Sequence, residues 1–176
     1  NPLKNLTNNG ISQDGYMKVA IFGDDRRPED TGNARSDFII IASINNDTKE
    51  VKLVSVYRDT LLNTEDDTYD KANSAYAVGG AEAAVNMLNR NLDLDIQDYV
   101  SVNFLAVADV VDLLGGIDLE LTDEEVVHMN NYCVETSEIT GKKYKKIEPE
   151  VAGTYHLNGV QAVSYSRIRY TEGGDF

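Results

Sequence analysis

The segment NARSDFIIIASI, residues 33–44, places an apolar run directly behind a charged entrance. Every residue from Phe38 to Ala42 is apolar, which is typical of a strand covered on both faces in a layered α/β sheet. Arg35 and Asp37, in contrast, are residue types that are rarely buried unless they are paired. The charged residues at the start of this core strand therefore mark either a solvated strand end or the edge of a functional site.

The composition fits a single globular domain and excludes some classes of partner. Of the 176 residues, 41% are hydrophobic and 26% are charged, which suits one domain with a sizeable core. The net charge of -14 argues against binding to a phosphate backbone, so we expect no nucleic-acid partner. Cys133 is the single cysteine and cannot form an intrachain disulfide. The sequence also lacks the run of about 18 apolar residues that a transmembrane helix requires.

Strand-like and helix-like segments follow one another along the chain. Strands are predicted at residues 16–23, 37–45, 51–57, 99–104 and 117–121. Helices are predicted at residues 80–92 and 105–116, after a capping box at Thr122, and after Asn158. Apolar residues show no clear periodicity over residues 133–152, which indicates a loop or lid. This order indicates one α/β sandwich domain over residues 1–176, with a mixed central sheet flanked by helices.

The hairpin between the second and third predicted strands fixes a position for two charged residues. If Asp47–Thr48 form a two-residue turn, the numbers of facing residues sum to 95, and Asp37 faces Arg58. If the first strand runs antiparallel to the second, Asp24 and Asp25 end at the same edge. A slip of one residue would break this arrangement. The alternative is a surface salt bridge worth about 0–1 kcal/mol.

The C-terminal segment SYSRIRY, residues 164–170, adds two arginines to the candidate groups. Arg167 and Arg169 are two residues apart, so in an extended segment both side chains lie on the same side. Like charges held together favour an anion, and guanidinium groups bind phosphate oxygens in pairs. Carboxylates favour a hard cation such as Mg²⁺. The combination points to Mg²⁺ with a phosphate or pyrophosphate.

Seven segments in order resemble one known family. They are IFGDDRR, ARSDFIIIASI, VKLVSVYRDT, DKANSAYAVGG, YVSVNF, VVDLLGGIDLEL and YHLNGVQAVSYSRIRY. From Val19 to Phe176 the chain is similar to the LytR-CpsA-Psr family of cell-envelope proteins. Each segment is a weak match alone, but the seven in the expected order are highly specific.

The resemblance implies a fold, an activity and a location. It implies an α/β fold with a mixed central sheet and a catalytic domain on the extracytoplasmic face of the membrane, anchored by an N-terminal helix. Such enzymes transfer a glycopolymer, of the teichoic acid or capsular polysaccharide type, from an undecaprenyl-pyrophosphate carrier to peptidoglycan or another envelope acceptor. The resemblance further implies Mg²⁺ as cofactor and an apolar tunnel for the prenyl chain.

The matched positions also imply roles for individual residues. Asp25 and Asp37 resemble the two metal-binding aspartates of the family. The residues that resemble pyrophosphate-binding groups are Arg35, Arg58, Lys71, Arg167 and Arg169. A base is needed to take the proton of the acceptor hydroxyl, and Asp37 or Asp59 would serve. The sequence does not choose between these two carboxylates.

This chain departs from the family pattern in three places. Tyr57 stands where the family commonly has a proline before Arg58. The family pattern continues beyond Phe176 to a further arginine and glutamine, and an N-terminal membrane helix precedes the domain. We therefore expect that the anchor and the C-terminal end of the domain lie outside this sequence.

Two other functions need the same residues. A polyprenyl-pyrophosphate phosphatase would use water in place of the sugar hydroxyl. A non-catalytic module would bind the lipid-linked glycan for a regulatory purpose. His128 and His156 have no metal-ligand partner at a useful spacing, so both are expected to be structural.

Overall fold

The computed structural model describes residues 3, 6, 10, 12–24 and 36–169. The chain divides into two compact units, Asn1–Asn103 and Phe104–Phe176, and each is described by itself. In the described part of the chain, no helix combines the length and apolar character needed to cross a membrane. The prediction of a single domain over residues 1–176 stays a prediction.

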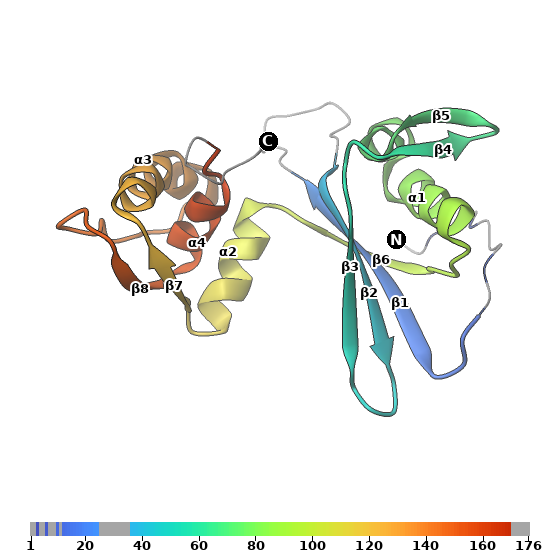
Figure 1. Cartoon of the computed structure of the whole chain (residues 1–176), viewed down its shortest axis with the longest axis horizontal. Coiled ribbons are helices and arrows are strands. Elements are labelled where there is room, and N and C mark those ends of the chain that lie inside the picture. The colour runs from blue at the N-terminus through green and yellow to red at the C-terminus, as the bar shows by residue number, and fades with distance from the viewer. Residues whose placement is uncertain (1–2, 4–5, 7–9, 11, 25–35, 170–176) are drawn as a thin grey trace. The chain divides into compact units, whose positions relative to one another are not determined.

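The main sheet of the first unit is mixed and has four strands (Figure 1). Its order is β3-β2-β1-β6, with β1 at Tyr16–Asp24, β2 at Ser36–Asn45, β3 at Val51–Val56 and β6 at Asp98–Val102. β2 runs antiparallel to both of its neighbours, whereas β1 and β6 run parallel. The parallel pair requires a crossover, which the helix α1, Ala72–Leu92, supplies. The predicted α/β class and mixed central sheet are confirmed.

The pairing of β2 with β3 has the predicted register. Ile39 faces Val56 and Ile44 faces Val51, so the facing numbers sum to 95. The predicted two-residue turn is wrong, because residues 46–50 separate β2 from β3, and the Asn45 amide donates to Glu50 O at 2.9 Å. The side-chain oxygen of Asn45 accepts hydrogen bonds from the amides of Asp47 and Thr48 at 2.9 Å each, and this longer loop preserves the register.

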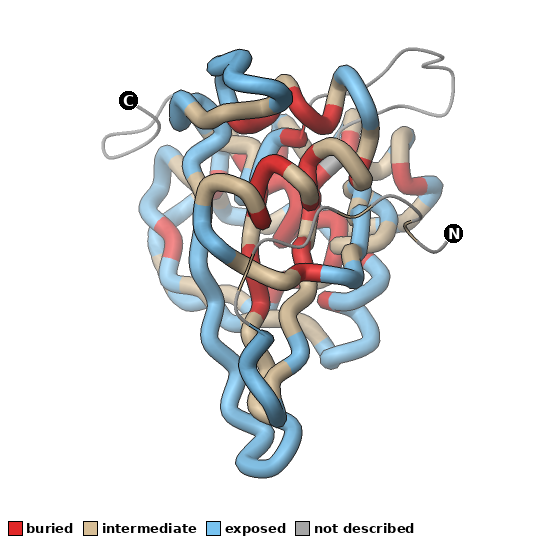
Figure 2. Tube along the Cα trace, turned by 90° about the vertical axis from the view of Figure 1, so that its right-hand side faces the viewer, coloured by how far each residue is buried: buried red, intermediate tan, exposed pale blue. Residues whose placement is uncertain are grey.

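The core of the first unit lies between α1 and one face of the sheet. Alternate residues of a strand share a face, and Phe22, Ile39 and Ile41 are buried on the face toward α1. Buried positions gather in this part of the sheet, while the β2–β3 loop is exposed (Figure 2). Burying each large apolar side chain contributes about 1.5–3 kcal/mol, so this face sets the register of the sheet.

A two-stranded hairpin, β4 (Leu61–Glu65) and β5 (Thr68–Lys71), packs beside α1. Its turn residues Asp66 and Asp67 adopt left-handed conformations with φ of 42° and 60°. Aspartate tolerates this region and is favoured in such two-residue hairpin turns. The sequence had not predicted this hairpin, because its residues are mostly polar and exposed.

The second unit packs three helices with a two-stranded sheet. Its elements are α2 (Phe104–Leu113), β7 (Ile117–Leu121), α3 (Asp123–Thr140), β8 (Gly153–Leu157) and α4 (Gly159–Ser166). β7 and β8 are antiparallel, and a separate cluster of buried apolar side chains forms the core. The predicted capping box at Thr122 is confirmed, and a second one opens α4 at Asn158.

The predicted loop over residues 133–152 is wrong at its start, whereas its end at residue 152 agrees with the structure. α3 continues to Thr140 and ends at Gly141, whose φ of 66° suits a helix C-terminus. Its last two turns bury Cys133, Thr136 and Thr140, a weakly apolar set that gave little periodic signal. At the other end, β8 pairs with β7 from Gly153 onward.

Replacing Thr122 with alanine tests the cap of α3. We expect the free energy of unfolding to fall by about 1 kcal/mol, because the Glu125 amide loses its hydrogen bond to the threonine hydroxyl. Urea denaturation followed by circular dichroism measures this change. Thr122→Ser keeps the hydroxyl and should retain most of the stability; an equal loss in both variants would contradict the capping role.

Candidate functional site

Asp37 and Arg58 form an ion pair at one edge of the first sheet. Asp37 is the second residue of β2, and Arg58 lies two residues beyond β3. Arg58 Nη1 donates to Asp37 Oδ1 at 3.1 Å. The two side chains are 43% and 49% exposed, so the pair is open to solvent and ligands. The contact predicted from the register of the hairpin is confirmed.

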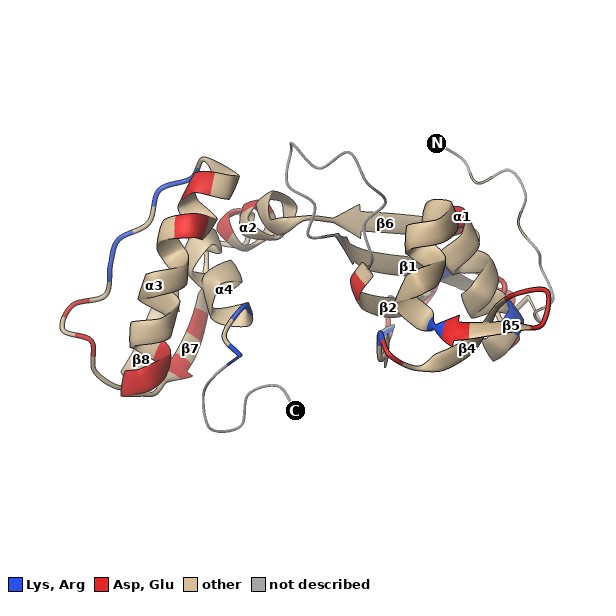
Figure 3. Cartoon of the chain, turned by 90° about the horizontal axis from the view of Figure 1, so that it is seen from above, with Lys and Arg blue, Asp and Glu red and all other residues tan. Residues whose placement is uncertain are grey.

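Two more charged residues extend this pair into an ion-pair chain, defined as Asp37, Arg58, Asp59 and Lys71. Arg58 Nε lies 3.7 Å from Asp59 Oδ2, and Lys71 Nζ lies 2.6 Å from Asp59 Oδ1. The two carboxylates and two cations alternate, and their formal charges cancel. Figure 3 shows these charges where β2, the β3–β4 loop and β5 meet. Four of the predicted site residues are therefore brought together.

The backbone beneath the ion-pair chain is fixed by the start of α1. The amide of Ala72 donates to Thr60 O at 2.9 Å, and the amide of Asn73 donates to Arg58 O at 3.0 Å. These bonds satisfy two amides of the first helical turn, which have no partner inside the helix. Because the backbone of Arg58 is held in this way, its side chain can change partners while its Cα stays in place.

Two buried polar atoms flank the ion-pair chain without a hydrogen-bond partner among the described residues. They are the hydroxyl of Ser36, next to Asp37, and the side-chain oxygen of Asn73. An unsatisfied buried polar group costs about 1–3 kcal/mol, so such atoms are often retained for a ligand. Carboxylate, hydroxyl and amide oxygens are the donors that Mg²⁺ prefers. The donor chemistry at this edge fits a hard cation.

The predicted metal ligands are described only in part. Asp25 and Arg35 lie outside the described residues. Asp24, the last residue of β1, pairs with Ser36, so β1 ends at the same edge as the start of β2, as predicted. Over the described ranges, no three His, Cys, Asp or Glu side chains gather in a way that could hold a metal. The metal role of Asp25 and Asp37 stays a prediction.

Arg167 lies in the second unit, and its predicted extended conformation is wrong. It ends α4 with φ and ψ of -91° and -5°, because the helix continues through Ser166. Its guanidinium donates to Glu135 Oε2 at 2.7 Å and to Thr136 Oγ1 at 3.0 Å. It also lies over the Phe104 ring, 5.0 Å from the centroid. Arg167 therefore has a counter-ion within its own unit.

Arg169 is more exposed than Arg167. Its Nη1 donates to Ser166 O at 3.4 Å, a contact to the last turn of α4. The two arginines do not form the parallel pair that an extended segment would give. Their predicted binding to pyrophosphate stays a prediction.

The ion-pair chain, the mixed sheet and the order of the motifs agree with one family. The profile of the LytR_cpsA_psr family matches residues 1–176.

The chain belongs to the LytR_cpsA_psr family.

Several named proteins are similar to this LytR_cpsA_psr domain. The polyisoprenyl-teichoic acid–peptidoglycan teichoic acid transferase TagU of Halalkalibacterium halodurans is 33% identical over 168 residues, covering 94% of this chain and 49% of the relative. Biofilm regulatory protein A of Streptococcus mutans is 35% identical over 149 residues, covering 80% of this chain and 34% of the relative. The chain thus spans half or less of each of these two relatives.

A solved structure of the family shows the same fold. The family protein TagT with bound octaprenyl pyrophosphate lipid matches with a TM-score of 0.64 and 26% identity, covering 95% of this chain and 61% of that one. The name of that structure records a polyprenyl pyrophosphate as its ligand.

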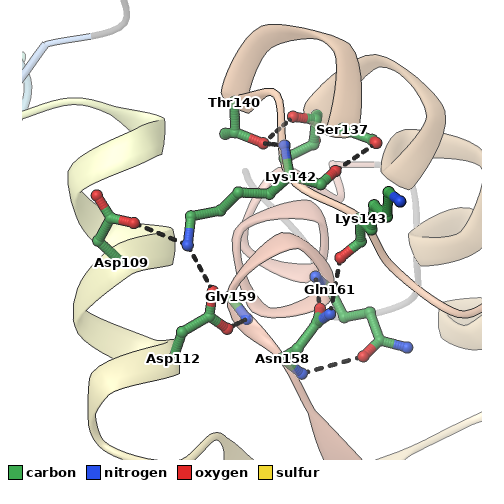
Figure 4. A network of polar contacts seen from close by, with 10 residues as sticks. Asp109, Asp112, Ser137, Thr140, Lys142, Lys143, Asn158, Gly159 and Gln161 are labelled. Carbon is green, nitrogen blue, oxygen red and sulfur yellow. Dashed lines mark hydrogen bonds and ion pairs between the residues drawn. The ribbon is translucent and has the colours of Figure 1, made fainter.

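A second polar cluster organises the second unit of this LytR_cpsA_psr domain (Figure 4). Lys142 Nζ lies 2.7 Å from both Asp109 and Asp112 of α2. Asp112 also accepts a hydrogen bond from the amide of Gly159, the first residue of α4. The hydrogen bond from Lys142, with that from Gly159, lowers the pKa of Asp112. Through these ion pairs Lys142 links the segment after α3 to α2, and we assign the cluster a structural role.

The sequence patterns did not predict the β4–β5 hairpin, so its polar residues were not identified as neighbours of Lys71. Only Lys71 was singled out, through the family resemblance. The Asp66–Asp67 dipeptide between LLNTE and TYDK is the signal that could have revealed the hairpin, because aspartate is favoured where φ is positive.

His156 joins the two strands of the second unit to the end of α2. Nδ1 lies 2.7 Å from Asp118 Oδ1, and Nε2 lies 2.7 Å from Gly115 O. Both neighbours are acceptors, so only the doubly protonated ring can donate to each of them. The hydrogen bonds to Asp118 and then to Gly115 raise the pKa of His156 above its ordinary value.

This raised pKa predicts a pH-dependent loss in His156→Gln. The imidazolium contacts stabilise the folded state fully below the unfolded pKa of about 6.5, and this contribution disappears as pH rises through the folded pKa. The variant should therefore be less stable than the wild type at pH 5.5 and equally stable at pH 9. Thermal unfolding at both pH values measures the difference. Asp118→Asn should weaken the same dependence, because the hydrogen bond to Gly115 O still raises the pKa of His156. A loss independent of pH would contradict the assignment.

Proposed function

We propose that this domain transfers a glycopolymer from a polyprenyl-pyrophosphate carrier to a hydroxyl of peptidoglycan or another envelope acceptor. The observation that carries the proposal is the ion-pair chain. It holds two exposed cations, Arg58 and Lys71, on a rigid sheet edge beside two carboxylates. The names of TagU and of the lipid-bound TagT structure supply the substrate class.

Pyrophosphate binding would proceed by exchange of ionic partners. A guanidinium binds phosphate oxygens through two parallel hydrogen bonds, and a pyrophosphate carries more charge than one carboxylate. The pyrophosphate would therefore take Arg58 and Lys71 from Asp37 and Asp59. Arg35, Arg167 and Arg169 are the further cations that we propose for this ligand.

The released carboxylates would have two tasks. Asp37, with Asp25, would hold Mg²⁺, which when bound neutralises charge on the pyrophosphate. Asp37 or Asp59 would accept the proton of the acceptor hydroxyl. The acceptor oxygen would then bond to the phosphorus that carries the glycan. The bond from that phosphorus to the bridging oxygen would break, and polyprenyl phosphate would leave with that oxygen, stabilised by the arginines.

The sheet face opposite α1 is our candidate for contact with the prenyl chain. Phe38, Leu53 and Val100 belong to this face, and they are 37%, 65% and 48% exposed. Exposed apolar side chains on one face suit a hydrocarbon ligand. Since peptidoglycan lies outside the membrane, we further propose that the domain works on the extracytoplasmic face, anchored by an N-terminal helix.

A regulatory module that binds the lipid-linked glycan is the second candidate. It is favoured by the similarity to biofilm regulatory protein A. A phosphatase acting on the same carrier would need the same cations. Incubation with polyprenyl-pyrophosphate glycan, Mg²⁺ and peptidoglycan separates the three functions. A covalent glycan–peptidoglycan product shows transfer, phosphate release alone shows a phosphatase, and binding with neither shows a module.

Arg58→Ala should lower the rate of transfer about 100-fold or more, because a charged donor to the reacting phosphates is lost. The far-ultraviolet spectrum should stay unchanged, since the exposed pair contributes little to stability. The formation of covalent product measures the rate. Lys52→Ala removes an exposed cation from β3 of the same hairpin and should leave transfer unchanged. Near-normal transfer by Arg58→Ala would overturn the assignment.

Chelation of Mg²⁺ should abolish transfer, and added Mg²⁺ should restore it. Asp37→Asn should require a higher Mg²⁺ concentration for half-maximal rate, because one anionic oxygen ligand is lost. A titration of rate against Mg²⁺ for the wild type and the variant measures this. Glu50→Gln, at the far end of the β2–β3 hairpin, is the matched control. Full activity in excess chelator would contradict the metal role.

A further inference from the structure

A pocket of about 340 Å³ lies between the β4–β5 hairpin and the first half of α1. The hairpin wall is polar and carries Thr64, Glu65, Asp66, Thr68 and Asp70. This volume is at the lower end of the range for small-molecule sites, so it suits one sugar ring better than a polymer. Neither the family match nor the names of the relatives indicate a ligand for this pocket.

The helix wall of the pocket is made of small and apolar residues. Ser74, Ala75, Val78 and Ala83 line it. α1 departs from helical geometry between Val78 and Ala83, where Gly80 has φ of 64° and ψ of -156°. Only glycine adopts this conformation readily. Ala75, Val78 and Ala83 give the pocket an apolar floor. Such a floor suits the apolar face of a sugar ring.

The charge of the pocket is opposite to that of a phosphate site. Three carboxylates line it, from Glu65, Asp66 and Asp70, and no lysine or arginine is among its lining residues. Figure 3 shows this acidic character on the β4–β5 hairpin. An anionic pocket repels phosphate and attracts an ammonium group. It would therefore exclude the lipid pyrophosphate and accept a ligand that carries an amine.

Two residues that line the pocket contact the backbone of Lys71. Asp70 precedes Lys71 and accepts a hydrogen bond from its amide at 2.7 Å. The hydroxyl of Ser74 donates to Lys71 O at 2.7 Å. Pocket residues thus hold the backbone of a residue whose ammonium group belongs to the ion-pair chain. Because successive residues of a strand point to opposite faces, the ammonium group of Lys71 lies on the other face of the hairpin from Asp70 and the pocket.

We propose that this pocket binds the acceptor as an amine-bearing saccharide, a role that rests on the proposed function. The ammonium group pairs with Glu65 and Asp66, and the sugar ring packs on the floor formed by Ala75 and Val78. The reacting hydroxyl belongs to another part of the same acceptor chain, because β5 is longer than one sugar ring. The acidic pocket thus favours the amine-bearing acceptor, and the cations of the ion-pair chain favour the pyrophosphate of the donor.

The first experiment measures binding of two probes to the whole chain by isothermal titration calorimetry at low salt. The probes are the glucosamine trimer, which carries amines, and its N-acetylated form, which carries none. We expect the glucosamine trimer to bind and Glu65→Gln/Asp66→Asn to weaken it about tenfold, as loss of a hydrogen bond to a charged group would. Asp67→Asn is the matched control, since Asp67 shares the left-handed turn and does not line the pocket. Equal binding of both trimers, or an equal effect of both sets of substitutions, would overturn the proposal.

The second experiment separates this proposal from the function on which it rests. In the transfer assay, Asp66→Asn should raise KM for an amine-bearing acceptor about tenfold and leave KM for the lipid donor unchanged. Transfer with an unchanged acceptor KM would overturn the pocket assignment and leave the proposed function standing. Absence of transfer by the wild type, with binding of the glucosamine trimer that depends on Asp66, would overturn the proposed function and support the pocket as an amine-sugar site.

Discussion

The pairing of β2 with β3 is the constraint on which the candidate site depends. A slip of one residue would separate Asp37 from Arg58 and turn Ile39 and Ile41 away from α1. Each of these isoleucines contributes about 1.5–3 kcal/mol by burial, whereas the exposed ion pair contributes about 0–1 kcal/mol. The apolar core therefore fixes the position of the charged groups, and the charged groups contribute little to the fold.

This division of energies explains why the ion-pair chain suits ligand exchange. Its members are held at their backbones, through the sheet and through the amide of Asn73, while their side chains are 43% to 58% exposed. In the proposed function, each carboxylate would hold a cation near the position where that cation binds pyrophosphate. A multiply charged ligand can replace these carboxylates at small cost, because solvent screens each exposed pair.

The parts of the fold that the sequence predicted are those fixed by local patterns. The hairpin register followed from two apolar strands around a turn. It is preserved although the loop is longer than predicted, because Asn45 bonds to Glu50 and their numbers also sum to 95. The cap at Thr122 also depends only on near neighbours. The β4–β5 hairpin was missed because its stability comes from packing on α1 rather than from its own polar residues. The ion pair of Arg167 was missed because its partner, Glu135, is 32 residues away in the sequence.

Arg58 and Arg167 illustrate how burial sets the role of a cation. Arg58 is 49% exposed, so the proposed exchange from Asp37 to a phosphate would leave both groups near water. Arg167 is 18% exposed, stacks on Phe104, and pairs with a carboxylate at 2.7 Å. Breaking such a pair leaves a charge with less solvation, which costs more than breaking an exposed pair. In the proposed function, a pyrophosphate would therefore engage Arg58 and Lys71 at lower cost than Arg167, and the sheet edge would be its primary anchor.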